Sequence, residues 1–278
     1  MNASLRLRAF PGPAQAVVGA RARRGLAAAL PPVLVAAGIV GLWQIFATVS
    51  HVRPQVLPTP AMVARQGWDW RSAIWANTVP TLEETLLGFA VSLACSFILA
   101  VAMELSRPCR RALYPLLITS QTLPLIAIAP LVDIWLGFGL LPKLVVVAVV
   151  TFFPVTVGLT EGFASAEPDG VDLLRSMGAT RRQVFCRLKL PGAMPYFFAG
   201  LRIAVTYAVV GAIFAEYVGA TSGLGIFMSE QNNQLRTDLV YAAVAVTAAL
   251  SVMLFGLTYL IQRVAIPWYG LQRRIGHS

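Results

Sequence analysis

Charged residues are scarce in this chain. Of its 278 residues, only 12% are charged and 57% are hydrophobic, and the mean hydropathy is +0.71. Soluble domains carry about 25% charged residues, so half that supply cannot cover a surface that faces water. The composition therefore excludes an ordinary soluble protein and predicts an integral membrane protein.

Cysteine and histidine are also few. The three cysteines, Cys95, Cys109 and Cys186, stand in no CxxC or Cys/His spacing, and the only histidines are His51 and His277. A zinc site needs closely spaced Cys and His ligands, and a thiol nucleophile needs a histidine base. We therefore expect no metal, no cofactor and no catalytic residue in this chain.

Long stretches without charge mark the membrane spans. Each approaches the roughly 20 residues that a helix needs to cross the hydrocarbon core. We expect an all-α membrane domain over residues 26–266, with a basic, mobile tail at 1–25 and a second tail at 267–278. Its six transmembrane helices are expected at Gly25–Ser50, Thr85–Met103, Ala112–Val132, Leu144–Thr160, Pro191–Glu216 and Leu239–Gln262.

The distribution of the basic residues sets the orientation. The 22 Lys and Arg outnumber the 12 Asp and Glu, giving a net charge of +10. With six spans and both termini in the cytoplasm, 17 basic residues fall inside and five outside. The positive-inside rule thus explains the charge without a nucleic-acid partner. On the outer side, Trp68, Trp70 and Trp75 predict an amphipathic segment at the membrane interface.

Two spans carry unusual patterns. The third contains Ser120-Gln121-Thr122-Leu123-Pro124, where a break would offer Gln121, Thr122 and freed backbone groups to a passing solute. A kink that serves packing alone is the alternative. The fifth has small residues at every fourth position, Gly200, Ala204, Ala208 and Ala212, so another helix can approach closely. That helix belongs either to this chain or to a second copy.

Acidic residues in the spans are candidates for the solute path. Asp133 and Glu216 lie within or at the ends of spans, where ionisable groups are costly and often functional. Two structural alternatives are open: Asp133 could pair with Lys143 near the outer boundary, and Glu216 could be a hydrogen-bonding anchor at the interface.

A polar cytoplasmic stretch, residues 161–191, is built as two short helices around a glycine. Pro168 suits a first helical turn, and Gly178 suits a helix end. Thr180 and Gln183 have the spacing of a capping box, and Pro191 marks the predicted end of the second helix. This pattern predicts a docking element, although an amphipathic hairpin on anionic lipid is also possible.

The same stretch resembles the EAA loop of ABC importer permeases, whose pattern is Glu-Ala-Ala, three residues, Gly, nine residues, Ile-x-Leu-Pro. Gly178, Leu190 and Pro191 are in register, Asp172 stands for the Glu, and Leu188 for the Ile. Leu173 and Leu174 replace the two alanines. The resemblance implies an ATPase-coupling role for Asp172, Met177, Gly178, Ala179, Thr180, Leu188, Leu190 and Pro191.

Other motifs, in the same order and spacing, resemble the nitrate/taurine/sulfonate branch of these permeases. They include Leu123–Leu131, Gly137–Gly139 and Ser222–Gly225. The resemblance implies the type I ABC importer permease fold in a bacterial inner membrane. It also implies a second permease subunit, expected to form a homodimer, an external solute-binding protein and cytoplasmic ATPases that hold ATP and Mg²⁺. The chain itself has no Walker A motif at Lys143 or Lys189, which agrees with hydrolysis on another chain.

Within this branch, Ser176–Thr180, Gly211–Gly219 and the stretch from Thr237 to Trp268 are most similar to permeases for the pyrimidine precursor of thiamine and for riboflavin. The resemblance therefore implies that the solute is a thiamine pyrimidine precursor or a riboflavin-like heteroaromatic. Arg202 is the only cation within a predicted span, which disfavours a dianion. The alternatives are a nitrate, taurine or aliphatic sulfonate permease, an ion-coupled secondary transporter, and a membrane scaffold that only docks a partner. A secondary transporter would need an internal repeat and a midplane ion site, for which the sequence offers little.

Overall fold

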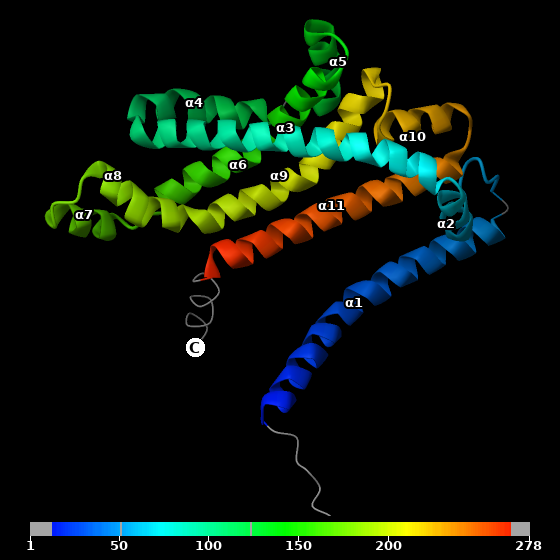
Figure 1. The fold of residues 1–278 in the computed structure, drawn as a ribbon, viewed down its shortest axis with the longest axis horizontal. Helices are drawn as coiled ribbons and strands as arrows, with labels where there is room; N and C mark the ends of the chain where they lie inside the picture. The colour runs from blue at the N-terminus through cyan, green and yellow to red at the C-terminus, as the bar shows by residue number, and fades with distance from the viewer. Residues whose placement is uncertain (1–12, 51, 123, 268–278) are drawn as a thin grey trace, which may run out of the picture.

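A computed structural model describes residues 13–50, 52–122 and 124–267, and the elements in these ranges are helices (Figure 1). The helices, in chain order, are α1 (Pro13–Val49), α2 (Pro60–Asp69), α3 (Arg71–Leu105), α4 (Arg107–Ser120), α5 (Leu125–Leu136), α6 (Leu140–Ala164), α7 (Pro168–Ser176), α8 (Arg181–Val184), the π-helical turn η1 (Phe185–Lys189), α9 (Leu190–Gly219), α10 (Leu224–Asn233) and α11 (Thr237–Ala265).

Five of the six predicted spans are long, continuous helices. Segments in α1, α3, α6, α9 and α11 are long and apolar enough to cross a membrane. The third predicted span differs, because α4 ends at Ser120 and α5 begins at Leu125, with Pro124 in an extended conformation between them. Proline lacks the N–H that would continue the helical ladder. The all-α class is confirmed, and the sixth apolar segment is the shorter Ala127–Leu136.

The predicted tails are described only in part. Helix α1 already begins at Pro13, so helix extends into the stretch predicted as a mobile tail at 1–25. Residues 1–12 and 268–278 lie outside the described residues. Figure 1 shows α1 leaving the bundle at the corner occupied by α2, where the amide of Ala61 donates a hydrogen bond to Gln44 Oε1 (3.2 Å).

The core of the bundle is α6, which packs against α3 on one side and α9 on the other. Gly200 makes the approach to α9 possible, since a Cβ there would lie 2.4 Å from the carbonyl oxygen of Pro154. Ala204, Ala208 and Ala212 continue this face and are fully buried. Within this chain, therefore, α6 is the helix that the small residues of the fifth span admit.

The segment before α3, which is predicted to lie on the outer side, forms the expected amphipathic helix. Thr59 caps α2 by accepting a hydrogen bond from the amide of Met62 (3.2 Å), and Pro60 occupies the first turn, where its missing N–H costs nothing. Val63 on the inner face is buried against α11, whereas Trp68 on the outer face is 70% exposed.

Candidate functional site

The predicted coupling loop, residues 161–191, begins with a well-terminated helix. Pro168 occupies the first turn of α7 and Asp169 lies at its positive end. At the other end, Gly178 has a left-handed φ of +83°. Its amide donates to the carbonyl of Arg175, and the amide of Ala179 donates to the carbonyl of Leu174, both at 2.9 Å. This is a Schellman motif, which only glycine forms without strain, so the predicted helix end at Gly178 is confirmed.

The second helix of the loop begins as predicted. Thr180 Oγ1 accepts a hydrogen bond from the amide of Gln183 (3.3 Å), and Gln183 Oε1 accepts one from the amide of Thr180 (2.7 Å). This reciprocal capping box satisfies two amides that the helix cannot pair. Helix α8 therefore starts at a fixed position directly after the Gly178 turn.

The predicted end of that helix at Pro191 is wrong. The chain remains helical from Arg181 to Gly219, through α8, η1 and α9. Pro191 has no N–H for the carbonyl four residues earlier, and a π-helical turn lies just before it. In this turn the amide of Leu190 donates to the carbonyl of Phe185, five residues back. The wider turn lets the coupling loop and the membrane helix α9 form one rod.

Three contacts hold this rod against the bundle. Val184 is buried, and the ring of Phe185 lies 5.2 Å, centroid to centroid, from that of Phe163 on α6. Lys189 Nζ lies 2.5 Å from Glu104 Oε1 at the end of α3. Sequence reasoning missed all of these contacts, because their partners lie far away along the chain.

The outward face of the loop is exposed and partly apolar. Met177 is 75% exposed and Leu173 is 63% exposed. Of the predicted coupling residues, Asp172, Met177, Gly178 and Thr180 are exposed. The remaining four are half-buried, so they contribute more to the packing of the loop than to its exposed surface: Ala179, Leu188, Leu190 and Pro191. Leu173 stands at one of the positions where leucine replaces alanine in the EAA pattern, and its side chain is exposed.

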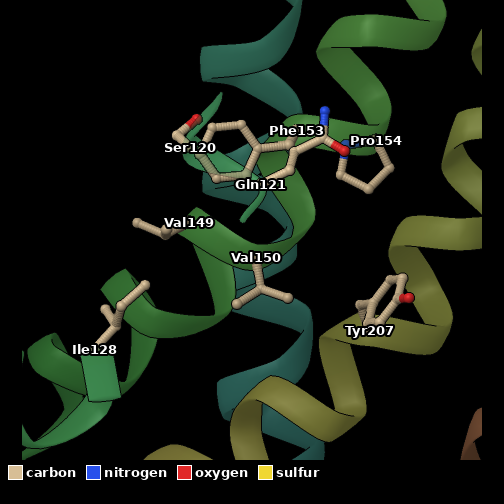
Figure 2. Close-up of a pocket in the computed structure, with 8 residues that line it drawn as sticks. All are labelled: Ser120, Gln121, Ile128, Val149, Val150, Phe153, Pro154 and Tyr207. Carbon is tan, nitrogen blue, oxygen red and sulfur yellow. The ribbon is translucent and has the colours of Figure 1, made fainter. Parts of the chain in front are cut away.

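The break between α4 and α5 borders two cavities. The first has a volume of about 230 Å³ and the second about 360 Å³, and Gln121, Pro154 and Tyr207 line both. Figure 2 shows the first cavity, whose lining comes from α4, α5, α6 and α9. Pro154 leaves the carbonyl of Val150 without its helical donor, which adds an acceptor to this wall.

Among the described residues, no charged side chain lines the first cavity. Its polar and aromatic lining residues are Ser120, Gln121, Phe153 and Tyr207. Among the described residues that line the second cavity, Glu161 is the one with a charged side chain. Such a lining suits a flat, uncharged molecule that both stacks and accepts hydrogen bonds, and it has no cation for an anionic group.

The four predicted path residues are not brought together. Gln121 lines both cavities, whereas Thr122 is exposed beside it and donates to the carbonyl of Thr119 (2.7 Å). Asp133 lies on α5 and is buried, and its Oδ2 has no hydrogen-bond partner among the described residues. Lys143 is paired elsewhere: its Nζ lies 2.5 Å from Glu84 Oε1, within the packed faces of α3 and α6.

Glu216 is fully buried and holds the start of α10. It accepts hydrogen bonds from Thr81 Oγ1 and from the amide of Gly225, both at 2.6 Å. Gly223, with φ +125°, lies so close that a Cβ there would be 2.2 Å from the Glu216 carboxyl carbon. The carboxylate thus lies at a helix N-terminus, the favourable end for an anion. This is the hydrogen-bonding anchor foreseen as an alternative, although it lies in the protein interior.

The sequence is similar to those of known membrane transport proteins. The profile of the family described as "Binding-protein-dependent transport system inner membrane component" matches residues 92–268. The formylaminopyrimidine transport permease protein ThiX of Halalkalibacterium halodurans is 34% identical, covering 86% of this chain and 96% of the relative. The riboflavin transport system permease protein RibX of Chloroflexus aurantiacus is 32% identical, covering 81% and 85%. The taurine transport system permease protein TauC of Escherichia coli is 30% identical, covering 84% and 87%.

A solved structure has the same fold. The crystal structure of an amino acid ABC transporter with histidines aligns with a TM-score of 0.59 at 16% sequence identity, over 70% of this chain and 95% of that one.

Proposed function

The chain belongs to the family of binding-protein-dependent transport system inner membrane components, and from that membership we propose that it forms the membrane path for a neutral heteroaromatic solute. The solute is of the kind of a thiamine pyrimidine precursor or riboflavin. ATP and Mg²⁺ are bound and hydrolysed on a separate cytoplasmic chain, and an external binding protein delivers the solute. Two copies of the chain pair in the bacterial inner membrane, with both termini in the cytoplasm.

The coupling loop is the surface proposed to receive the ATPase. Covering exposed apolar side chains such as Met177 and Leu173 with a partner lowers the free energy, because their apolar surface leaves water. The Schellman motif at Gly178 and the capping box at Thr180 fix the surface before docking, so little conformational entropy is lost. Because α8, η1 and α9 are one rod, a push on the loop moves a membrane helix directly.

The uncharged lining of the first cavity is the observation that carries the solute class. An aromatic face at Phe153 and an amide at Gln121 match a planar heterocycle with hydrogen-bonding edges. A sulfonate would have to leave water without a compensating cation, which is costly. Gln121 is therefore proposed to touch the solute, whereas path roles for Thr122, Asp133 and Glu216 stay predictions.

The decisive experiment is uptake into proteoliposomes that contain the chain with its ATPase and binding protein. The partners are identified by mild-detergent pull-down of the tagged chain and mass spectrometry. We expect uptake of radiolabelled formylaminopyrimidine or riboflavin and none of taurine. Gln121→Leu should reduce uptake strongly, and Gln234→Leu, which removes an exposed amide outside both cavities, should not.

Two results would contradict the proposal. Taurine uptake that survives in Gln121→Leu would place this chain with the sulfonate permeases. Absence of any ATPase in a pull-down that recovers a control importer intact would leave the loop as a lipid or scaffold contact and favour a secondary transporter.

A further inference from the structure

A third cavity opens between α2, α3 and α11, with a volume of about 410 Å³. Val63, Ile74 and Ala242 form its buried apolar floor. Gly67 lets α2 approach α11 closely at this floor, since a Cβ there would lie 3.2 Å from the Ala242 Cβ. None of the residues that line the two cavities beside Gln121 lines this one.

The surroundings of this groove identify its level in the membrane. Trp68 and Trp75, on α2 and α3, are 70% and 68% exposed, and Trp75 is part of the lining. Exposed indole rings of a membrane protein lie at the boundary between headgroups and hydrocarbon. The apolar floor therefore extends from that boundary toward the hydrocarbon, where an acyl chain is the available filler.

One cation stands in the lining. Arg71 Nη1 donates to the carbonyl of Trp68 (2.9 Å), and its guanidinium carbon lies 5.1 Å from the centroid of the Trp68 ring. These contacts hold the guanidinium in place while leaving further N–H groups free. Among the described residues, no carboxylate lies within ion-pair distance of Arg71. A fixed guanidinium with free donors is suited to a phosphate.

We propose that this groove binds an anionic glycerophospholipid of the leaflet on the α2 side, with one acyl chain on the apolar floor and the phosphodiester on Arg71. The charge of Arg71 and the apolar floor are complementary to the two ends of such a lipid. Helix α1 does not fill the groove within the chain: Trp43 packs on Tyr241 of α11 and against the cluster that contains Val63, and Gln44 bonds to Ala61, but no described residue of α1 is part of the lining. The site is separate from the proposed solute path and does not depend on it.

The test is native mass spectrometry of the full chain, delipidated in detergent and titrated with phosphatidylglycerol or phosphatidylcholine. We expect one tightly bound phosphatidylglycerol per chain, and weaker binding of phosphatidylcholine. Arg71→Gln should weaken phosphatidylglycerol binding about tenfold, the effect of one charge-assisted contact, and remove the preference between the lipids. Arg71→Lys should restore part of the preference. Arg65→Gln, an exposed arginine outside the groove, is the matched control.

A second variant tests the acyl chain. Ala245 is an exposed residue of the groove wall, so Ala245→Phe fills the groove without disturbing the core, and it should abolish the tight site. Ala248→Phe, on the next turn and outside the lining, should not. Unchanged lipid binding in both Arg71→Gln and Ala245→Phe would show general annular lipid only and overturn the proposal. A change from dimer to monomer in Ala245→Phe, with lipid binding unchanged, would assign the groove to a second copy and equally overturn it.

Discussion

Lys189 and Glu104 form an ion pair, with Nζ and Oε1 2.5 Å apart, at the point where the coupling loop becomes a membrane helix. The lysine is the last residue of η1, and the glutamate lies one residue before the end of α3. The pair is mostly shielded from solvent, so its partners hold each other more strongly than an exposed pair would. It ties the rod to a helix that otherwise contacts the loop little.

Glu104→Gln should uncouple ATP hydrolysis from uptake while leaving the ATPase bound. The loop surface stays intact, but the rod is no longer fixed to α3. We expect a loss of about 1.5–3 kcal/mol of stability, the range for a hydrogen bond to a charged group. Thermal unfolding and the ratio of solute moved to ATP hydrolysed measure the two effects. Asp172→Asn, which breaks the exposed 3.7 Å pair with Arg175, is the stability control and should cost less than about 1 kcal/mol.

Gly178→Asp should detach or uncouple the ATPase. A side chain at φ +83° strains the backbone by about 1–2 kcal/mol, and a negative charge enters the docking surface. Gly192→Ala, at an exposed glycine with open space around it and no positive φ, should behave as wild type. ATPase co-purification and uptake that are both unchanged in Gly178→Asp would refute the docking assignment.

Lys143→Met should be strongly destabilising, by about 3–5 kcal/mol, because it leaves the Glu84 carboxylate buried without its partner. The double variant Glu84→Gln/Lys143→Met should recover much of this loss, since no uncompensated charge remains. Thermal unfolding in detergent tests both. Equal destabilisation of the single and double variants would mean that packing, not charge, dominates at this position.

Gly223→Ala should disrupt the start of α10. The new methyl group would overlap the Glu216 carboxyl and strain a positive φ, so we expect a cost of about 1–3 kcal/mol. Gly256→Ala, in α11 with open space around it, should be neutral or slightly stabilising. Limited proteolysis between α9 and α10 would report the loosened turn, and equal cleavage of the two variants would argue against the Glu216 anchor.

The sequence predicts the elements whose causes are local. The Schellman turn at Gly178 and the capping box at Thr180 are set by residues within one or two helical turns, so both were predictable. The break at Gln121 was predictable for the same reason, because Pro124 acts on the backbone beside it. The charge-free windows located the spans, but α3 begins at Arg71, well before the predicted start at Thr85. The helix can include Glu84 because this carboxylate is paired with Lys143 on α6.

What the sequence could not predict depends on contacts between distant segments. Glu84 and Lys143 are 59 positions apart, and Lys189 and Glu104 are 85 apart. The spacing of Gly200 and its alanines predicted a close helix but not which one. Pro191 was misread as a helix end because the rule for proline assumes α-helical hydrogen bonding, and a π-helical turn removes that assumption.

The π-helical turn also sets the rotational phase of the loop relative to the membrane helix. Val184 and Ala193 are nine positions apart, so an uninterrupted α-helix would place them about 180° apart around its axis. Both are nevertheless buried. One extra residue in the turn reduces that angle to about 80°, which brings both toward the same side. The extra residue thus fixes the direction in which the proposed docking surface faces relative to the membrane helix, and an insertion or deletion between 185 and 189 would turn it away by more than a quarter of a revolution.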